Sequence, residues 1–220
     1  MFVGHFGPSY AVKALRPAIP LWVLFIAVQF VDVIWAVLVL LGVEKVRIIP
    51  GITASNPLDL YYMPYTHSLV AAICWSVAAG TAVWHLPRVA NRPAAVWIGA
   101  AVFSHWVLDL VVHRPDLPLY GNTMKVGLGL WNYPVIALSL EAALLFGGML
   151  MYLSVTRPIN MIGRIGPPAF GVAMLAIQSF VFFGPPPASP VAAATTALVS
   201  YVVFAVIAEW LARQRRRTAV

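Results

Sequence analysis

Charged residues are scarce in this chain of 220 residues. Asp, Glu, Lys and Arg make up 10% of the sequence, whereas hydrophobic residues make up 61%. Soluble domains usually carry roughly 25% charged residues, so the composition excludes an ordinary soluble globular domain. We expect residues 1–220 to form a single integral membrane domain, in which 1–154 carry the motifs and 155–220 add two further spans and a basic tail.

Cysteine is almost absent as well. The only one, Cys74, excludes an intrachain disulfide and paired-cysteine metal motifs. The N-terminus lacks a basic region followed by a long apolar core and a cleavage site, so we expect no cleaved signal peptide. Part of the net charge of +7 comes from a C-terminal tail that contains Arg213, Arg215, Arg216 and Arg217. Such a tail typically fixes topology or contacts anionic lipid, and we expect no nucleic-acid binding.

Long apolar runs, by contrast, fill most of the chain. We predict spans at 21–41, 60–84, 94–112, 130–152, 168–183 and 191–211. Most of these runs reach the ~20 residues that a helix needs to cross the hydrocarbon core. The run at 168–183 is shorter and follows a pair of prolines. The sequence therefore predicts an all-α, polytopic membrane helix bundle with about six transmembrane helices.

The first twenty residues predict a different element. The segment 4–15 is too short to span a membrane, and Lys13 and Arg16 place its end at the cytoplasmic interface. Pro17 and Pro20 interrupt the helix before the first span begins. We predict a half-membrane helix that descends into a hairpin. At 1.5 Å per residue, residues 5 and 32 then lie ~16 and ~20 Å above the hairpin, close enough in height to meet.

The basic residues predict the orientation of the bundle. One side carries ten of them: Lys13, Arg16, Arg88, Arg92, Arg157, Arg164, Arg213, Arg215, Arg216 and Arg217. The other side carries four: Lys45, Arg47, Arg114 and Lys125. Because cytoplasmic loops are enriched in Lys and Arg, the first side and the C-terminus are expected in the cytoplasm.

Ionisable residues within the predicted spans fall at one depth. They are Asp32, His67, the pair His105 and Asp109 at i and i+4, and Glu141. Counted from the outer ends of the spans, these positions lie roughly 5–17 Å deep. Buried carboxylates and imidazoles without basic partners require either protons or a bridging cation. Imidazole and carboxylate suit Zn²⁺ or a similar divalent ion, and a hydrogen-bonded network without metal is the alternative.

Short motifs connect these residues in a recognisable order. They are Gly4-His5-Phe6, the segment with Asp32, Thr66-His67-Ser68, Ser104-His105 with Asp109, and Gly127 with Leu130-Trp131 and Pro134. Over roughly the first 135 residues, this order resembles the LexA-binding, inner-membrane-associated metal-dependent hydrolases, also called membrane-bound metal-dependent hydrolases. The family commonly has a second Asp where this chain has Ile34, and His-Arg where it has Tyr62-Met63-Pro64-Tyr65. These departures favour one bound metal over two.

The resemblance implies metal-assisted hydrolysis in a bacterial inner membrane. A divalent metal, with zinc as the expected ion, is held by protein ligands and keeps an open position for water, whose pKa it lowers toward ~7. The expected ligands are His67, His105 and Asp109, joined by His5 and Asp32 as further ligands or as a second half-site.

Other residues receive supporting roles. Glu141 is the expected general base, because it comes from a facing span, and Gln29 is expected to support the ligands. His113 continues the helical face of Asp109 by one step and is predicted as a substrate contact or proton carrier, with an ordinary polar interface as the alternative. Arg114 and Lys125 at the mouth suit an anionic headgroup. A lipid or amphiphilic ester or phosphoester is the expected substrate, because a site at membrane depth is reached from the lipid.

Two other functions fit the same residues. A proton- or ion-coupled transporter would use them as a relay, although the chain is small and shows no inverted repeat or paired broken helices. A non-catalytic membrane protein would use a metal only to join its helices, and a closed coordination shell would indicate that role.

Overall fold

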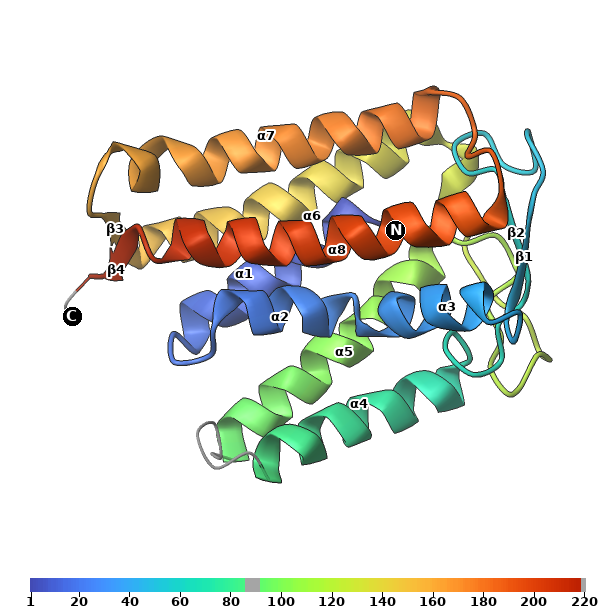
Figure 1. Ribbon diagram of the computed structural model, residues 1–220, viewed down its shortest axis with the longest axis horizontal. Coiled ribbons are helices and arrows are strands. Elements are labelled where there is room, and N and C mark those ends of the chain that lie inside the picture. The colour runs from blue at the N-terminus through green and yellow to red at the C-terminus, as the bar shows by residue number, and fades with distance from the viewer. Residues whose placement is uncertain (86–91, 219–220) are drawn as a thin grey trace.

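The computed structural model describes residues 1–85 and 92–218, which form a bundle of helices (Figure 1). The helices are α1 (Phe6–Leu15), α2 (Leu21–Val28), α3 (Phe30–Leu40), α4 (Leu69–His85), α5 (Arg92–Val112), α6 (Pro134–Ser154), α7 (Met161–Phe183) and α8 (Pro190–Ala212). Two short 3₁₀ helices are η1 (Val3–His5) and η2 (Leu130–Asn132). The strands are β1 (Lys45–Ile48), β2 (Leu58–Tyr62), β3 (Thr156–Pro158) and β4 (Arg215–Arg217).

The described helices confirm an all-α membrane protein. Four of them are long and apolar enough to cross a membrane, namely α5, α6, α7 and α8. Helices α2 and α3 meet at a bend of 58° and make a fifth span if they are counted together. The predicted count of about six is therefore not reached among the described residues.

Two predicted spans have different boundaries in the structure. The run at 60–84 begins with β2 and a loop that contains Pro64, and only its later part forms α4, which has 17 residues. Tyr61 and Tyr62 favour a strand, and β2 pairs with β1 in an antiparallel sheet. The run at 168–183 lies within the 23-residue α7, which begins earlier because the Asn160 side chain accepts a hydrogen bond from Gly163 N at 2.9 Å and caps the helix.

The predicted N-terminal half-membrane helix is present as α1. Its ten residues span ~15 Å, about half of a hydrocarbon core. The Lys13 side chain donates to the carbonyls of Pro17 and Ile19, both at 2.7 Å, and closes the turn before α2. Helix α1 packs very closely against α6 at Gly7 and Gly148. A Cβ atom on either glycine would collide with the backbone of the other helix. The short helix is thus held inside the bundle.

The first span is interrupted at Gln29, where the sequence pattern predicts a continuous helix. Gln29 has φ −104° and ψ 7°, and a new helix, α3, starts at the next residue. Asp32 therefore lies in the first turn of α3, where the helix dipole favours a negative charge. Irregular backbone is tolerated inside a membrane where it is buried in protein, as Gln29 is here.

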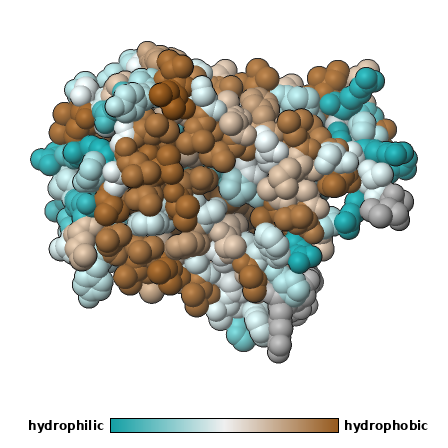
Figure 2. All heavy atoms as spheres, turned by 180° about the vertical axis from the view of Figure 1, so that it is seen from behind, coloured by the Kyte–Doolittle hydropathy of each residue, from teal (hydrophilic) through white to brown (hydrophobic). Residues whose placement is uncertain are grey.

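Polar structure gathers at the two ends of the bundle. The β1–β2 hairpin lies at one end, and the β3–β4 pair lies at the other, so Arg47 and Arg157 are on opposite ends as predicted (Figure 1). Arg88, which also enters the orientation prediction, lies outside the described residues. Figure 2 shows a broad apolar area across one face, with hydrophilic side chains toward both ends. This distribution matches a protein whose middle lies in lipid.

Candidate metal centre

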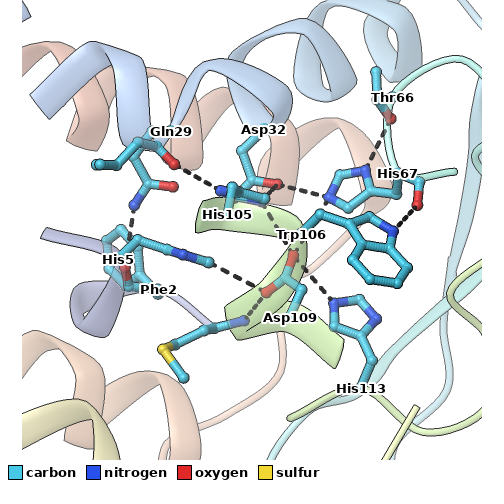
Figure 3. Close-up of polar contacts among 12 residues, drawn as sticks. Phe2, His5, Gln29, Asp32, Thr66, His67, His105, Trp106, Asp109 and His113 are labelled. Carbon is cyan, nitrogen blue, oxygen red and sulfur yellow. Dashed lines mark hydrogen bonds and ion pairs between the residues drawn. The ribbon is translucent and has the colours of Figure 1, made fainter. Parts of the chain in front are cut away.

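Residues from four separate segments meet in one buried cluster (Figure 3). Its members are the predicted ligands His5 of η1, Asp32 of α3, His67 before α4, and His105 and Asp109 of α5. Two overlapping groups have the geometry to hold a metal ion: His5 with His105 and Asp109, and Asp32 with His67 and His105. In each group the ligand atoms lie within 4.8 Å of one another.

Four of the ligand atoms form a closed ring. Nε2 of His67 lies 3.1 Å from Oδ1 of Asp32 and 3.7 Å from Oδ2 of Asp109. Nε2 of His105 lies 3.5 Å from the same Asp32 oxygen and 3.1 Å from the same Asp109 oxygen. Two ligands that each lie about 2.1 Å from a tetrahedral metal are about 3.4 Å apart. The four distances around the ring are therefore close to the spacing between two ligands of one metal ion.

Hydrogen bonds fix which imidazole nitrogen faces the ring. Nδ1 of His105 lies 2.7 Å from the carbonyl oxygen of Val28, to which it donates. The Thr66 hydroxyl donates to Glu44 at 2.6 Å and therefore accepts from Nδ1 of His67 at 2.8 Å. In the neutral rings, both Nε2 atoms then carry lone pairs that point at carboxylate oxygens. Nε2 of His105 is buried and has no hydrogen-bond partner.

This arrangement fits a divalent cation. Lone pairs of Asp32, Asp109 and the two imidazoles converge in a buried space, where they repel one another unless a proton or a cation lies between them. Histidine and carboxylate ligands together match zinc and related divalent ions. The hydrogen-bonded Nδ1 atoms orient the rings in the way that supporting residues orient metal-bound histidines. The residues present therefore fit the metal that the sequence predicts.

Glu44, at the turn after α3, supports His67 from the membrane edge. Its carboxylate accepts from the backbone N–H of Tyr65 at 2.8 Å and of Thr66 at 3.1 Å, in addition to the Thr66 hydroxyl. Burial raises the pKa of the Glu44 carboxyl, and these hydrogen bonds oppose that rise. Thr66 of the Thr-His-Ser motif thus links a carboxylate to a ligand imidazole.

His5 completes the cluster on the far side of His105. The two rings stack at 4.0 Å with an interplanar angle of 9°, and Nε2 of His5 lies 3.2 Å from Oδ1 of Asp109. That oxygen also accepts from the amino group of Met1 at 2.6 Å. The predicted meeting of His5 with Asp32 is therefore mediated by the His105 ring, which lies between them (Figure 3).

His113 lies directly beyond α5 and faces the cluster. Its Nε2 is 3.6 Å from Oδ2 of Asp109, and its Nδ1 is 2.9 Å from Oδ1 of Asp116. The Trp131 ring packs over the His113 ring with centroids 4.2 Å apart. Gly127 lies against the backbone carbonyls of His113 and Arg114, where its φ of +155° and these oxygens leave no room for a Cβ atom. The Gly-xx-Leu-Trp motif therefore positions the imidazole.

Glu141 is buried beside the cluster and has three protein donors. One oxygen accepts from the backbone N–H of Phe2 and of Gly4, each at 3.1 Å, and the other accepts from Gln178 Nε2 at 3.0 Å. These bonds connect α6 to the N-terminal segment that carries His5. The role of Glu141 as general base stays a prediction, and its contacts equally describe an anchor for that segment.

Two supporting residues enter the site differently from the sequence prediction. Gln29 was expected to support the ligands, and its side chain donates to the carbonyl of Phe2 at 3.1 Å. Tyr201 was not among the predicted site residues, and its hydroxyl donates to Oδ2 of Asp32 at 2.7 Å. A tyrosine in the middle of an apolar span was the available signal, because a buried phenol needs a hydrogen-bond partner.

The structure places Arg114 and Lys125 away from the cluster. Arg114 pairs with Asp59 and, through Nε at 3.2 Å, with Asp116. Lys125 donates to the carbonyl of Tyr61 at 2.9 Å. Their role in binding an anionic headgroup stays a prediction, and their present partners are protein groups.

The cluster opens onto a cavity of about 500 Å³. Asp32, His67, Asp109 and His113 line one part of it, and mostly apolar residues of α7, α8, the loop between them, the β2 segment and the N-terminus line the rest. The polar cluster is thus reachable from a space large enough for a small ligand. In comparisons with known proteins, no family model, curated protein or solved structure matches the chain.

Proposed function

We propose that this protein is a membrane-embedded, metal-dependent hydrolase, in keeping with the family that its motifs resemble. The observation that supports this most strongly is the ring of Asp32, His67, His105 and Asp109 ligand atoms beside an open cavity. A divalent ion such as zinc supplies Lewis acidity to such a site and activates water. The ring residues would hold that ion.

His5 and Tyr201 would support the ring from opposite sides. His5 contacts the second oxygen of Asp109, and Tyr201 contacts the second oxygen of Asp32. Each carboxylate therefore has one oxygen in the ring and one oxygen restrained by a neighbour. Supporting contacts of this type fix the direction of a ligand. Their loss typically lowers metal affinity about 10–100-fold.

His113 is the residue best placed to carry a proton. It lines the cavity, and Asp116 orients its ring by accepting from Nδ1. Nε2, which lies 3.6 Å from Oδ2 of Asp109, would then take a proton from water and return it to a leaving group, as in other imidazole–carboxylate pairs. Glu141 does not line the cavity, and its bonds to the N-terminal backbone support a positioning role.

A structural metal is the second candidate. Four protein ligands are enough to close a tetrahedral shell, and closed shells are typical of metals that only stabilise a fold. The cavity favours hydrolysis over this reading, because a metal that only joins helices needs no space beside it. Turnover and metal content, measured separately, distinguish the two functions.

The setting of the site follows the charge pattern. We place the protein in a bacterial inner membrane with its C-terminus in the cytoplasm, which puts the β3–β4 end inside. The support is the excess of basic residues predicted for that side. The cluster then lies nearer the outer surface, on the side of the β1–β2 hairpin.

A hydrolysis screen tests the proposed function. The purified protein is incubated with carboxylic esters, phosphoesters and amides of lipid alcohols, with and without a chelator, and zinc is then added back. We expect turnover of at least one class, its loss with chelator, and its recovery with metal. Turnover that is indifferent to chelator, or a metal-loaded protein inactive on every class, contradicts the proposal.

A further inference from the structure

The cavity beside the cluster extends to the apolar surface of the bundle. Its walls include Phe180 and Val181 of α7 and Ala193 and Ala197 of α8. Phe180 is 65% exposed and Val181 is 48% exposed, so this wall faces the surroundings as well as the cavity. In a membrane-spanning bundle, those surroundings are lipid tails. The cavity therefore joins the lipid side of α7 and α8 to the His and Asp side chains.

The positively charged amino group of Met1, which lines the cavity, is paired with Asp109 at 2.6 Å. Apart from that group and the cluster, the polar groups of the cavity are neutral hydrogen-bonding side chains, namely Asn56, Gln178, Thr196, Ser200 and Tyr201. Among the described residues that line it, none is Lys or Arg. Proteins typically recognise phosphate headgroups with Arg or Lys side chains or with helix N-termini. Arg114, which was predicted to bind an anionic headgroup, is paired with Asp59 and Asp116.

The volume limits what the cavity holds. About 500 Å³ lies within the range of sites for one drug-sized ligand, so it accommodates one alkyl chain and a small head more readily than a diacyl lipid. Trp35 of α3 and Phe182 of α7 contribute to its walls, and the proline run 185–187 contributes from the α7–α8 loop. These apolar walls suit a flexible hydrocarbon chain.

We propose that the substrate is a single-chain amphiphile with an uncharged ester, of the monoacylglycerol type. Its chain enters between α7 and α8, and its ester carbonyl lies beside the cluster; this inference rests on the proposed hydrolase function. In the reaction, a water oxygen bonds to the carbonyl carbon, and the bond from that carbon to the alcohol oxygen breaks. The alcohol oxygen takes a proton, so one water and one ester give a fatty acid and glycerol.

Binding is tested apart from turnover with a glycerol monoether. This probe has a photoreactive group in its alkyl chain and cannot be hydrolysed at the ether. After irradiation in nanodiscs, we expect the label on peptides from α7 and α8. Ala197→Trp places an indole in the cavity and should reduce labelling about tenfold or more. Val199→Trp is the matched control, because Val199 lies on α8, is 57% exposed and does not line the cavity.

The outcomes separate this inference from the proposed function. Labelling of α7 and α8 that Ala197→Trp abolishes and Val199→Trp retains supports the chain site, even if no ester is turned over. Labelling that is absent, or equal in the two variants when both unfold at the wild-type temperature, overturns it, even if another ester is hydrolysed. If an alkyl phosphate reduces the labelling more strongly than an unlabelled glycerol monoether does, the proposal of an uncharged headgroup is wrong.

Discussion

Nε2 of His105 lies 3.1 Å from Oδ2 of Asp109, one turn further along α5, while Nδ1 of the same ring donates to the carbonyl of Val28. The carbonyl partner leaves the lone pair of Nε2 facing a carboxylate oxygen. Val28 is the last residue of α2, directly before the break at Gln29, so the break supplies the acceptor that orients this ligand. The bend between α2 and α3 is therefore part of the site.

Loss of the Tyr201 hydroxyl should weaken metal binding without removing a ligand. Tyr201→Phe deletes the hydrogen bond to Oδ2 of Asp32, which leaves that carboxylate free to turn away from the ring. We expect metal affinity to fall about 10–100-fold, measured by competition with a chromogenic chelator. Tyr152→Phe, at a buried tyrosine of α6 outside the cluster, is the control and should keep wild-type affinity. Equal affinity in wild type and Tyr201→Phe would remove Tyr201 from the site.

Substitution of Asp116 should lower the rate of hydrolysis and have little effect on metal content. Asp116→Asn can no longer accept from His113 Nδ1 as a carboxylate, so the ring loses its preferred orientation and tautomer. We expect hydrolysis to fall by about 10²–10⁴-fold while metal content stays near wild type. Asp59→Asn is a matched control, because Asp59 also pairs with Arg114 but does not contact His113. A similar loss of turnover in both variants would assign the effect to Arg114 instead.

Variants of Glu141 distinguish a general base from a residue that anchors the N-terminal segment. Glu141→Gln keeps an oxygen for the backbone N–H groups of Phe2 and Gly4. Its new amide can donate to Gln178 Oε1, which has no partner, once the Gln178 amide turns over from its present donation through Nε2. We therefore expect Glu141→Gln to retain metal and turnover within a few-fold. A fall in hydrolysis of about 10²–10⁴-fold with metal retained would show that Glu141 is the general base that the sequence predicts.

Glu141→Ala is the companion variant, because it leaves the buried N–H group of Gly4 and the partly buried N–H group of Phe2 without their acceptor. The cost should be about 1–3 kcal/mol or more in unfolding free energy. The measurement is thermal unfolding of the purified protein in detergent. An alanine variant as stable as the glutamine variant would argue against an anchoring role.

The orientation of the bundle is tested with fusions. A reporter fused after residue 220 should read as cytoplasmic, because most of the basic residues are predicted on the same side as the C-terminus. A second reporter inserted in the β1–β2 turn should read as external. A C-terminal reporter that reads as external would reverse the proposed topology.

The membrane class and the ligand layer are predictable from sequence for a physical reason. Apolar runs of about twenty residues have few alternatives to a spanning helix. Ionisable residues such as Asp32 and His105 are costly there, so each one indicates a functional site, and their common depth indicates that they belong to the same site. Helical spacing brings His105 and Asp109 to one face, and the structure places both in the cluster.

Other features depend on tertiary contacts, which the positions of the apolar runs in the sequence do not reveal. The break at Gln29 follows no proline or glycine, and the β2 strand lies in a run apolar enough to predict a helix. Tyr201 meets Asp32 across 169 positions of sequence, so only the packing of α8 on α3 reveals the pair. The ion pairs of Arg114 similarly depend on where β2 places Asp59.

The metal content of the purified protein tests the central claim most directly. Elemental analysis should find about one divalent ion per chain in the wild type, and His105→Ala and Asp109→Ala should each lose it, because both supply ring atoms. His85→Ala, at the end of α4 and outside the cluster, should retain it. A wild-type protein without bound metal after purification free of chelators, or full metal in both ring variants, would contradict the account.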